Sequence, residues 1–319
     1  MKILAIQNRM GIGDMVIFLP YIEAVAKKYN SQVTLLVKEN SKAEQLIKDN
    51  KYINEIIILK RDHTKKSFHD GLNGFFRLVS EIKKYQFDKV LIFNSSLRYR
   101  LVCRFAGIND IYQYPLFEKE NQHIVDAASN LLKNKFNLEI KSDPVIKIKD
   151  EKIQNIRAKF NFDDDFKNIL LGIGGSGPTK RIPSKIFIEF MNLCLKNFKC
   201  RFFLATGNKN EEIKIMNEIL NYHKNICTPL NELSISETLP VIKNCNIAVC
   251  NDSSFSHLSA GLGKPTIVLM SDTPLIYGSY SSKMHPIMPD GVENVTHGTE
   301  GKEQINPIKI FEKFKSLVN

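Results

Sequence analysis

Short apolar runs alternate with longer amphipathic segments along most of this chain, and this alternation narrows the folds open to it. In the first half, the sequence predicts strands at residues 3–6, 33–37, 56–59, 90–93 and 111–114. Between and after them it predicts helices at residues 14–29, 43–48, 75–84, 97–106 and 123–136. Such βαβ repetition is typical of a parallel sheet that helices cover on both faces. Pro20 predicts a kink or a restart in the first helix.

The second half repeats the pattern, with predicted strands at residues 169–172, 202–205, 247–249 and 266–269 and helices at residues 184–197, 210–220, 236–243 and 255–260. A polar, lysine-rich segment separates the halves, and we place a boundary near Asp143-Pro144. We therefore expect two α/β domains, residues 1–145 and 146–319, on either side of a central cleft. Asn306 and Pro307 predict the start of a final helix, which is free to pack back on the first domain.

The charge balance favours an anionic partner. The chain carries 45 Lys+Arg against 34 Asp+Glu, a formal charge of +11. A phosphorylated substrate, an acidic membrane surface or nucleic acid would each suit that charge, and so would lysines that only face solvent. Because the basic residues are scattered, without a run of five, we expect no nucleic-acid partner.

Cysteine spacing and hydropathy indicate a cytoplasmic protein. The six cysteines include no CxxC pair, so we expect buried free thiols and neither a metal site nor disulfides. No apolar run reaches the roughly 18 residues that span a membrane. Residues 1–6 are typical of a strand rather than a signal peptide. Peripheral contact with a membrane remains open.

Three polar turns follow predicted strands, at the sheet edge where ligands bind in open α/β folds. The first is residues 7–14, in which Gly11 and Gly13 let the backbone approach a ligand closely. Asp14 falls at the following helix start, where it either caps the helix or faces the ligand. Because a glycine-rich loop and an acid coincide here, we favour a functional role over a simple tight turn.

The second turn, residues 172–183, is rich in glycine and followed by Lys180. Its Gly172-x-Gly174-x-x-Gly177 spacing is formally a dinucleotide fingerprint, but Pro178 follows and no acidic residue ends the next strand. The Walker pattern is excluded because Gly177 is followed by Pro-Thr. The residues instead predict another kind of phosphate cradle, with side chains from Ser176, Thr179 and Lys180.

The third turn opens a short helix directly after the strand at residues 247–249. Its polar residues are Asp252, Ser253, Ser254 and His257. Serine and aspartate favour helix starts, and His257 lies one helical turn after Ser253. We therefore expect an acid, two hydroxyls, backbone amides and an imidazole to meet a ligand here. Lesser candidates are Glu211, after residues 202–205, and Arg98, after residues 90–93.

Together the three turns resemble those of glycosyltransferase family 9, the lipopolysaccharide heptosyltransferases. Residues 10–14 with Pro20 are similar to that family's S-x-x-G-D followed by proline, and residues 174–183 to its G-x-x-x-x-K-R-W-P. Residues 252–265 are similar to its D-[TS]-G-x-x-H-x-A-A-A-L-G-K-P, the most specific of the three. The resemblance covers most of the chain in the expected order.

The resemblance implies a GT-B fold of two Rossmann-like domains, with the acceptor on the first and a nucleotide-sugar on the second. It implies transfer of a heptose, with inversion and without a metal or other cofactor, from an ADP-sugar to a lipopolysaccharide core or related envelope glycan. The acceptor would be an anionic glycolipid at the cytoplasmic face of the inner membrane. Asp14 would be the general base, with Gly11, Gly13 and Arg98 on the acceptor side. The implied donor-binding residues are Ser176, Thr179, Lys180, Glu211, Asp252, Ser253, Ser254 and His257.

Some positions depart from the family pattern. Ser254 replaces a glycine, Met10 a serine and Ile182 a tryptophan, and residues 270–274 match F-G-P-T only loosely. These departures keep two alternatives open. One is a GT-B enzyme that uses another nucleotide-sugar, including an epimerase-like relative, and the other is a nucleotide-sugar-binding protein without catalysis.

Overall fold

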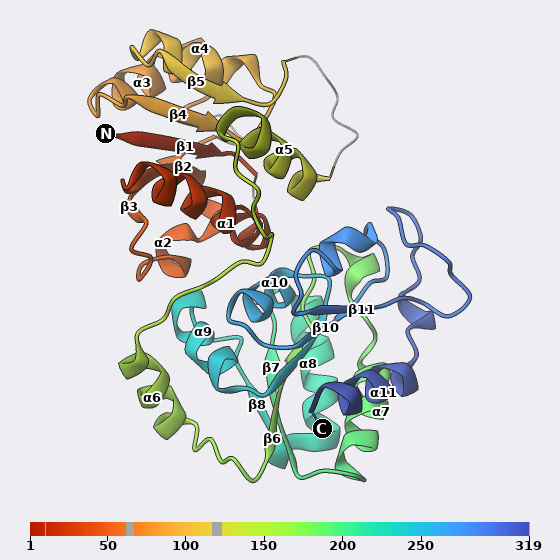
Figure 1. Ribbon diagram of the computed structural model, residues 1–319. Coiled ribbons are helices and arrows are strands. Elements are labelled where there is room, and N and C mark those ends of the chain that lie inside the picture. Colours follow the sequence, from red (N-terminus) through yellow and green to blue (C-terminus); the bar gives the residue numbers. More distant parts are fainter. Residues whose placement is uncertain (10, 62–66, 117–122, 319) are drawn as a thin grey trace. The chain divides into compact units, whose positions relative to one another are not determined.

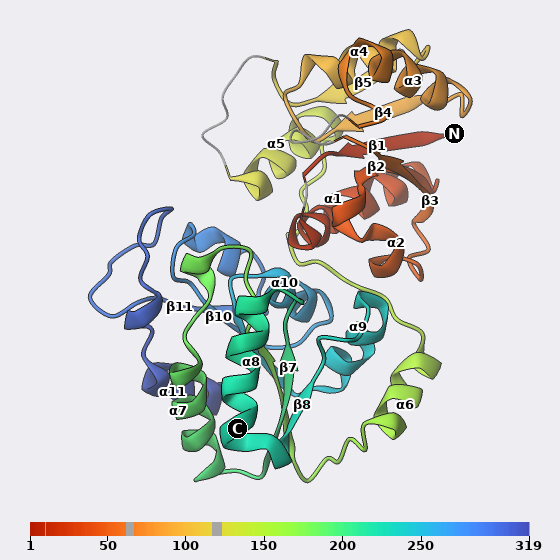
Figure 2. The ribbon, with the colours of Figure 1, turned by 180° about the vertical axis from the view of Figure 1, so that it is seen from behind.

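The computed structural model describes residues 1–9, 11–61, 67–116 and 123–318 and contains two compact units (Figures 1 and 2). Unit 1 is Met1–Ser142 and unit 2 is Asp143–Asn319, so the chain divides beside the Asp143-Pro144 dipeptide. Each unit is built on one parallel sheet, which confirms the predicted α/β class. In the described ranges, no helix is long and apolar enough to cross a membrane.

The sheet of unit 1 has the order β3-β2-β1-β4-β5, and all neighbouring strands run parallel. The strands are β1 (Ile3–Gln7), β2 (Val33–Lys38), β3 (Ile53–Leu59), β4 (Lys89–Ile92) and β5 (Asp110–Gln113). Every residue of β1 and β2 is buried, as continuous apolar runs predict for strands covered on both faces. The strand order reverses between β1 and β4, so the ligand crevice expected of this topology opens there.

Helices cover both faces of this sheet. They are α1 (Ile12–Tyr29), α2 (Ala43–Leu46), α3 (Gly71–Lys83), α4 (Leu97–Phe105) and α5 (Ile124–Phe136). Figure 1 shows α3 and α4 on one face and α1 and α5 on the other. Leu78 and Ile82 of α3 and Val102 of α4 pack against the sheet. On the opposite face, the Tyr21 hydroxyl donates to the Val125 carbonyl at 3.2 Å and joins α1 to α5.

The sheet of unit 2 has the order β11-β10-β9-β6-β7-β8 and is also parallel throughout. Its strands are β6 (Lys167–Gly172), β7 (Cys200–Ala205), β8 (Cys227–Pro229), β9 (Ile247–Asn251), β10 (Thr266–Leu269) and β11 (Met284–Ile287). Its helices are α6 (Asp150–Lys159), α7 (Ser184–Leu195), α8 (Asn210–His223), α9 (Ile235–Asn244), α10 (Ser254–Gly261) and α11 (Pro307–Val318). Here the strand order reverses between β6 and β9.

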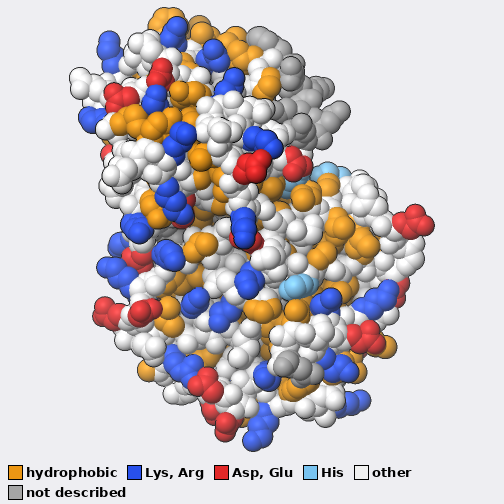
Figure 3. Space-filling view, viewed as in Figure 1, with side chains coloured by type: hydrophobic (Ala, Val, Ile, Leu, Met, Phe, Trp, Pro, Cys, Tyr) orange, Lys and Arg blue, Asp and Glu red, His pale blue; other side chains and the backbone are white. Residues whose placement is uncertain are grey.

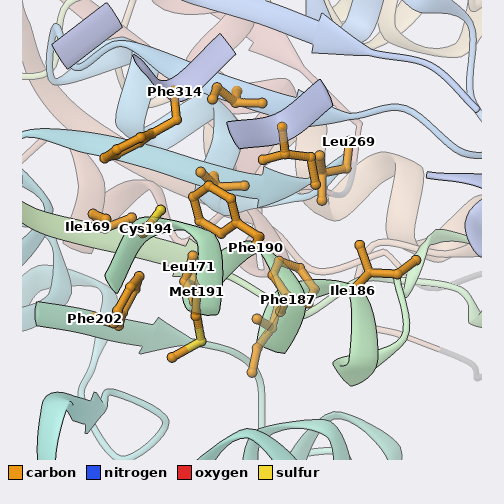
Figure 4. Close-up of a cluster of buried hydrophobic side chains, with 14 of the residues drawn as sticks. Ile169, Leu171, Ile186, Phe187, Phe190, Met191, Cys194, Phe202, Leu269 and Phe314 are labelled. Carbon is orange, nitrogen blue, oxygen red and sulfur yellow. The ribbon is translucent and has the colours of Figure 1, made fainter. Parts of the chain in front are cut away.

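A hydrophobic core of unit 2 lies between the sheet and the helices α7, α8 and α11 (Figure 4). Phe187 and Phe190 of α7 are fully buried against β6, and Phe190 meets Phe314 of α11 edge to face at 5.8 Å. The final helix therefore gives its apolar face to unit 2. The Asn306 side chain caps this helix by accepting from the Ile308 amide at 2.9 Å, as predicted.

The sequence analysis missed one helix and two strands among the described residues. Helix α6 buries no residue, and β8 and β11 have only three and four residues. Of the kink or restart predicted at Pro20, the restart is wrong, because α1 runs through Pro20 as one helix; the kink stays a prediction. Proline removes one backbone hydrogen bond, and burial of α1 on both sides of Pro20 outweighs that loss.

All six cysteines are free, and all but the half-buried Cys227 are buried, as expected.

Candidate functional site

The second and third polar turns meet at the switch point of unit 2. Strands β6 and β9 are hydrogen-bonded neighbours, so the loop after β6 and the start of α10 after β9 lie at the same sheet edge. Lys180 ends a short 3-10 turn, Pro178–Lys180. Asp252 and Ser253 connect β9 to α10. The structure thus brings two motifs about 70 residues apart in the sequence to one place.

A buried ion pair joins these turns. The Lys180 Nζ donates to the Asp252 Oδ2 at 2.8 Å. The Asp252 side chain is 5% exposed and the Lys180 side chain 23%. Burial acts to raise the pKa of Asp252, but Lys180 and His257 outweigh it and leave that pKa below its ordinary value. The carboxylate is therefore a fixed internal charge, while the lysine faces the surface at this sheet edge.

His257 lies one turn into α10 and is buried. Its Nδ1 is 3.0 Å from the Tyr280 hydroxyl, and the two rings stack with centroids 5.6 Å apart. A hydrogen bond to one imidazole nitrogen fixes the orientation of the ring and the role of the other nitrogen. The sequence did not single out Tyr280, which follows β10 and a 3-10 turn and so had no local motif to mark it.

The start of α10 differs from the expected cap. Ser253 occupies the N-cap position, but its side chain makes no capping hydrogen bond. The Ser256 amide, which such a side chain would bind, donates to the Ser253 carbonyl instead, at 3.2 Å. Capping by the Ser253 side chain, as the serine preference for helix starts predicts, is therefore wrong. Helix N-termini leave backbone amides without intrahelical partners, and the Ser253 hydroxyl bonds to none of them among the described residues.

Glu212, which the sequence analysis missed, organises the glycine-rich loop. Its buried carboxylate accepts from the Gly175 amide at 2.8 Å. A Cβ atom at Gly174 or at Gly207 would lie 2.7 Å from one of its two oxygens, so a larger residue at either position would displace the Glu212 carboxylate. The predicted Glu211 is exposed in the first turn of α8. The structure brings Glu212, rather than Glu211, to the loop.

The remaining predicted donor residues divide into exposed and tethered side chains. Ser176 is exposed at the tip of the loop. The Thr179 carbonyl accepts from the Ser271 hydroxyl at 2.8 Å. The Thr179 hydroxyl also lowers the pKa of Asp272 by hydrogen bonding to its carboxylate. These contacts tie the turn that carries Lys180 to the segment after β10.

Buried polar atoms without a protein partner gather at the same edge. The Asn251 amide nitrogen donates to the carbonyls of Ile173 and Gly174, at 2.8 and 3.2 Å. Its Oδ1, the Thr206 Oγ1 and the Ser253 Oγ are buried and make no hydrogen bond to any described residue. Buried polar atoms are nearly always hydrogen-bonded in folded proteins. Three exceptions at one sheet edge are typical of a site that binds a polar ligand.

Unit 1 presents a second polar edge at its own switch point. Gly11 is the N-cap of α1, and Asp14 accepts from its amide at 3.1 Å. Arg9 lies 3.9 Å from the other carboxylate oxygen. The Asp14 side chain is 22% exposed, so it caps the helix and also keeps an accessible side. Gly13 is buried in the first turn of α1. Met10 lies outside the described residues.

Arg98 is held by its own unit. It donates to the carbonyls of His69 and Gly71, at 2.9 and 3.1 Å, and stacks over the Phe75 ring at 5.5 Å. Burial lowers the pKa of its guanidinium. These contacts tie α4 to the start of α3. Contact of Arg98 with an acceptor stays a prediction.

Buried polar atoms with no partner among the described residues also lie at the carboxyl edge of the unit 1 sheet. Gln7, at the end of β1, is fully buried, and neither polar atom of its side chain is hydrogen-bonded to a described residue. The same holds for the Nδ2 of Asn94, after β4, and the Oε1 of Gln113, at the end of β5. The sequence could have found these residues, because each is a polar amide at the end of an apolar strand.

Two departures from the family pattern can be placed. Ile182, in place of tryptophan, is fully buried and part of the main core of unit 2, so it acts in packing. Ser254, in place of glycine, is the half-buried first residue of α10. Among the described residues, no group of three His, Cys, Asp or Glu side chains is arranged to hold a metal ion.

Comparison with known proteins agrees with this geometry. Residues 75–289 match the profile of glycosyltransferase family 9 (heptosyltransferase). The chain is 21% identical over 324 residues to lipopolysaccharide heptosyltransferase 1 of Campylobacter coli, covering 93% of this chain and 92% of that protein. The E. coli ADP-heptose lps heptosyltransferase II superposes with a TM-score of 0.76 at 18% identity, covering 100% and 98% of the two chains. The E. coli heptosyltransferase WaaC with ADP gives 0.73 at 14% identity, covering 99% of each.

The superpositions define the fold as GT-B-like, built from two parallel-sheet units. The profile match spans more than half of the chain. The chain therefore belongs to glycosyltransferase family 9, and it is a glycosyltransferase.

Proposed function

We propose that this enzyme transfers a heptose from ADP-heptose, with inversion, to a lipopolysaccharide core or a related anionic envelope glycan. One observation carries the proposal: the Lys180–Asp252 ion pair lies beside the uncapped amino end of α10, at the switch point of unit 2. Relatives named for ADP-heptose or solved with ADP support the choice of donor.

The donor side follows from the charge that the reaction creates. When the bond between sugar and diphosphate breaks, negative charge grows on the leaving ADP. A lysine and the amides of a helix start stabilise such charge. In the proposed site Lys180 binds the diphosphate, Asp252 holds the ammonium in place, and Ser176 and Thr179 add hydroxyls. Ser253, Ser254 and His257 contact the diphosphate and sugar at the start of α10.

Glu212 takes a different part from the one predicted for Glu211. Its carboxylate already holds the Gly175 amide and lies between Gly174 and Gly207. We assign it the shaping of the loop that carries Lys180. Glu211, exposed one residue earlier, remains a candidate for direct contact with the nucleotide.

The acceptor side is proposed for unit 1. Asp14 takes the proton from the acceptor hydroxyl as its oxygen bonds to the anomeric carbon and ADP leaves. A single displacement of this kind inverts the anomeric centre, and a carboxylate within reach is a suitable base. Gly11 and Gly13 shape the loop. Gln7, with two buried polar atoms and no partner among the described residues, is placed to bind a hydroxyl-rich ligand. We propose that the reaction occurs at the cytoplasmic face of the inner membrane.

The alternatives rest on Ser254. Glycine would leave the first turn of α10 open, whereas a serine adds a side chain beside the proposed diphosphate site. A donor with another nucleotide, or binding without turnover, would accommodate that change.

Calorimetric titration of ADP, UDP, GDP and NAD into the full chain without metal tests the donor. We expect selective binding of ADP. Lys180→Ala should weaken it by about 1.5–3 kcal/mol, the range for a charge-assisted hydrogen bond. Lys185→Ala is the matched control, because Lys185 is an exposed lysine of α7 that pairs with Glu303 at 3.1 Å.

The outcomes separate the candidates. Preference for another nucleotide would change the proposed sugar and keep the family. A protein that binds ADP but releases no ADP when ADP-heptose and a heptose-free core acceptor are both supplied would be non-catalytic. Equal ADP binding by wild type and Lys180→Ala would remove Lys180 from the donor site.

A further inference from the structure

Exposed apolar side chains concentrate on one part of unit 1. Of the eleven large apolar side chains that are exposed among the described residues, six lie between residues 68 and 105. They are Phe68, Leu72, Phe76, Leu97, Leu101 and Phe105. They come from α3, from the residues just before it and from α4, and these two helices pack against each other. We call these six side chains and Phe75 the α3–α4 surface.

Ring contacts join the two helices within this surface. Phe75 contacts Phe76 with ring centroids 5.2 Å apart and reaches Phe105 of α4 at 5.9 Å. The Arg77 guanidinium lies 4.6 Å above the Phe68 ring. On α4, the apolar residues recur every fourth position from Leu97 to Phe105, which places them on one helix face. Leu72 is 80% exposed and Phe76 60%, so both project well beyond the core.

Positive charge surrounds the apolar side chains. Helix α4 contains three arginines, Arg98, Arg100 and Arg104, and no acidic residue. Helix α3 contains Arg77 and Lys83, and its one carboxylate, Glu81, is bonded to His69 at 3.0 Å. Figure 3 shows apolar side chains broken by lysine and arginine along the edge of unit 1 that carries these helices. The surface is therefore apolar and basic together.

Soluble monomers rarely expose apolar patches of this kind without a partner. A symmetric dimer through this surface would bring the same patch of both copies together, and the arginines of the two α4 helices would then repel each other. An anionic lipid bilayer suits both features, because phenylalanine and leucine enter the boundary of headgroups and acyl chains while arginine binds phosphates. We propose that the α3–α4 surface docks unit 1 onto an anionic bilayer surface.

The topology gives this docking a consequence. Helices α3 and α4 follow β3 and β4, so their amino ends lie at the carboxyl edge of the sheet of unit 1. Asp14 follows β1 at the same edge. Docking through Leu72 and Leu97 would bring this edge of unit 1 toward the lipid headgroups. Docking through the α3–α4 surface deepens the proposed function, on whose membrane location it rests, and does not depend on the nucleotide or the sugar.

Vesicle flotation of the full chain tests the proposal, with phosphatidylcholine vesicles compared with vesicles that contain phosphatidylglycerol. We expect binding to the anionic vesicles that falls as salt is raised. The double variant Leu72→Ser/Phe76→Ser should lower the partition coefficient roughly 10-fold or more, because it removes apolar area from the lipid. Tyr222→Ser/Ile308→Ser removes two exposed apolar side chains of unit 2 and should leave binding unchanged.

The charge is tested separately. Arg100→Glu/Arg104→Glu should lower binding to anionic vesicles roughly 30-fold or more, from the contribution of each basic residue near an anionic leaflet. Lys214→Glu changes an exposed lysine of α8 in unit 2 and should have little effect.

A site-specific probe is available because the chain has no tryptophan. Phe76→Trp introduces one on the α3–α4 surface, and Tyr222→Trp introduces a matched one on unit 2. We expect the emission of the first to shift to the blue on anionic vesicles and to be quenched by brominated lipid, and that of the second to stay unchanged. Circular dichroism melting checks that each variant is folded.

Three results would overturn the proposal. The first is equal binding of wild type and Leu72→Ser/Phe76→Ser to anionic vesicles. The second is the absence of a blue shift for Phe76→Trp. The third is a wild type that does not bind vesicles but forms a dimer in sedimentation equilibrium, with the dimer lost in Leu72→Ser/Phe76→Ser. That result would make the surface a contact between two copies.

Discussion

Substituting Lys180 or Asp252, one at a time, should lower the stability of the protein by different amounts. The Asp252 side chain is 5% exposed and the Lys180 side chain 23%. Lys180→Met leaves a buried carboxylate without its cation. Asp252→Asn leaves an ammonium that can turn toward water. We therefore expect Lys180→Met to lower the free energy of unfolding more than Asp252→Asn at pH 7.

The distance and burial of the pair set the size of the effect. At 2.8 Å and an effective dielectric constant of about 20, the Coulomb attraction is ~6 kcal/mol, a ceiling that desolvation offsets. Removing one partner of a buried pair costs ~3–5 kcal/mol. Because Lys180 is partly exposed, we expect about 3 kcal/mol for Lys180→Met and about 1 kcal/mol for Asp252→Asn. The double variant Lys180→Met/Asp252→Asn should be more stable than Lys180→Met alone.

The pH dependence gives a second test. The pKa of Asp252 in the folded protein lies below its ordinary value of 3.8. Ionised Asp252 therefore stabilises the fold above pH 3.8, and this contribution is lost as the pH falls through the folded pKa. In Lys180→Met the nearest cation is gone, and burial raises the pKa of Asp252. The stability difference between wild type and Lys180→Met should thus narrow between pH 7 and pH 4, as Asp252 in the variant takes up a proton.

Urea unfolding followed by far-ultraviolet circular dichroism measures these differences, and hydrogen exchange in β9 assigns them to unit 2. Equal losses for the two single variants would contradict the asymmetry that we infer from exposure. A difference between wild type and Lys180→Met that does not change with pH would show that Asp252 is not the stranded charge. Strict additivity in the double variant would mean that the two side chains do not interact.

Further predictions concern the proposed general base, the loop and the core. Asp14→Asn should lower kcat about 10²–10⁴-fold in an ADP-release assay and leave ADP affinity by calorimetry unchanged, as expected for a lost general base; unchanged turnover would remove Asp14 from that role. Glu212→Ala should cost about 1–3 kcal/mol in urea unfolding, because it leaves the Gly175 amide without its acceptor, whereas the exposed Glu211→Ala should stay within about 0.5 kcal/mol. Phe190→Ala should cost about 3–5 kcal/mol in the same assay, and a loss below 1 kcal/mol would mean that α7 repacks around the cavity.

Much of the fold could be predicted from the sequence, because buried parallel strands are continuous apolar runs. The runs at β1, β2, β6 and β9 are bounded by polar residues, so their ends were visible. In a parallel sheet these ends share one edge, which places the loops after β6 and β9 together. By contrast, α6 buries no side chain, and β8 has only three residues. Elements of this kind show no apolar periodicity from which the sequence could predict them.

The candidate site was predictable by position but not by side-chain geometry. Glu211 and Glu212 are adjacent, and only the phase of α8 decides which one turns inward. Met216 and Ile219 are buried. Glu212 lies four positions before Met216 and seven before Ile219, and residues at these spacings share one face of a helix. That spacing points to Glu212, so the signal was present in the sequence. By contrast, nothing in the sequence indicates that the Ser253 side chain does not cap α10. Helix-cap preferences predict the residue type at the N-cap position but not the rotamer of its side chain.

Buried polar atoms that make no hydrogen bond to a described residue relate the stability of each unit to its proposed ligand binding. A buried polar atom without a hydrogen bond costs about 1–3 kcal/mol. In unit 2 the atoms of Thr206, Asn251 and Ser253 carry that cost, and in unit 1 Gln7 carries it twice. All four residues lie at carboxyl edges of their sheets, beside the loops with Lys180 and Asp14. A ligand that hydrogen-bonds to these atoms relieves the cost only in the folded protein, so it gains affinity and stabilises the fold together. The proposed donor on unit 2 and the proposed acceptor on unit 1 should therefore each raise the stability of the unit that binds it.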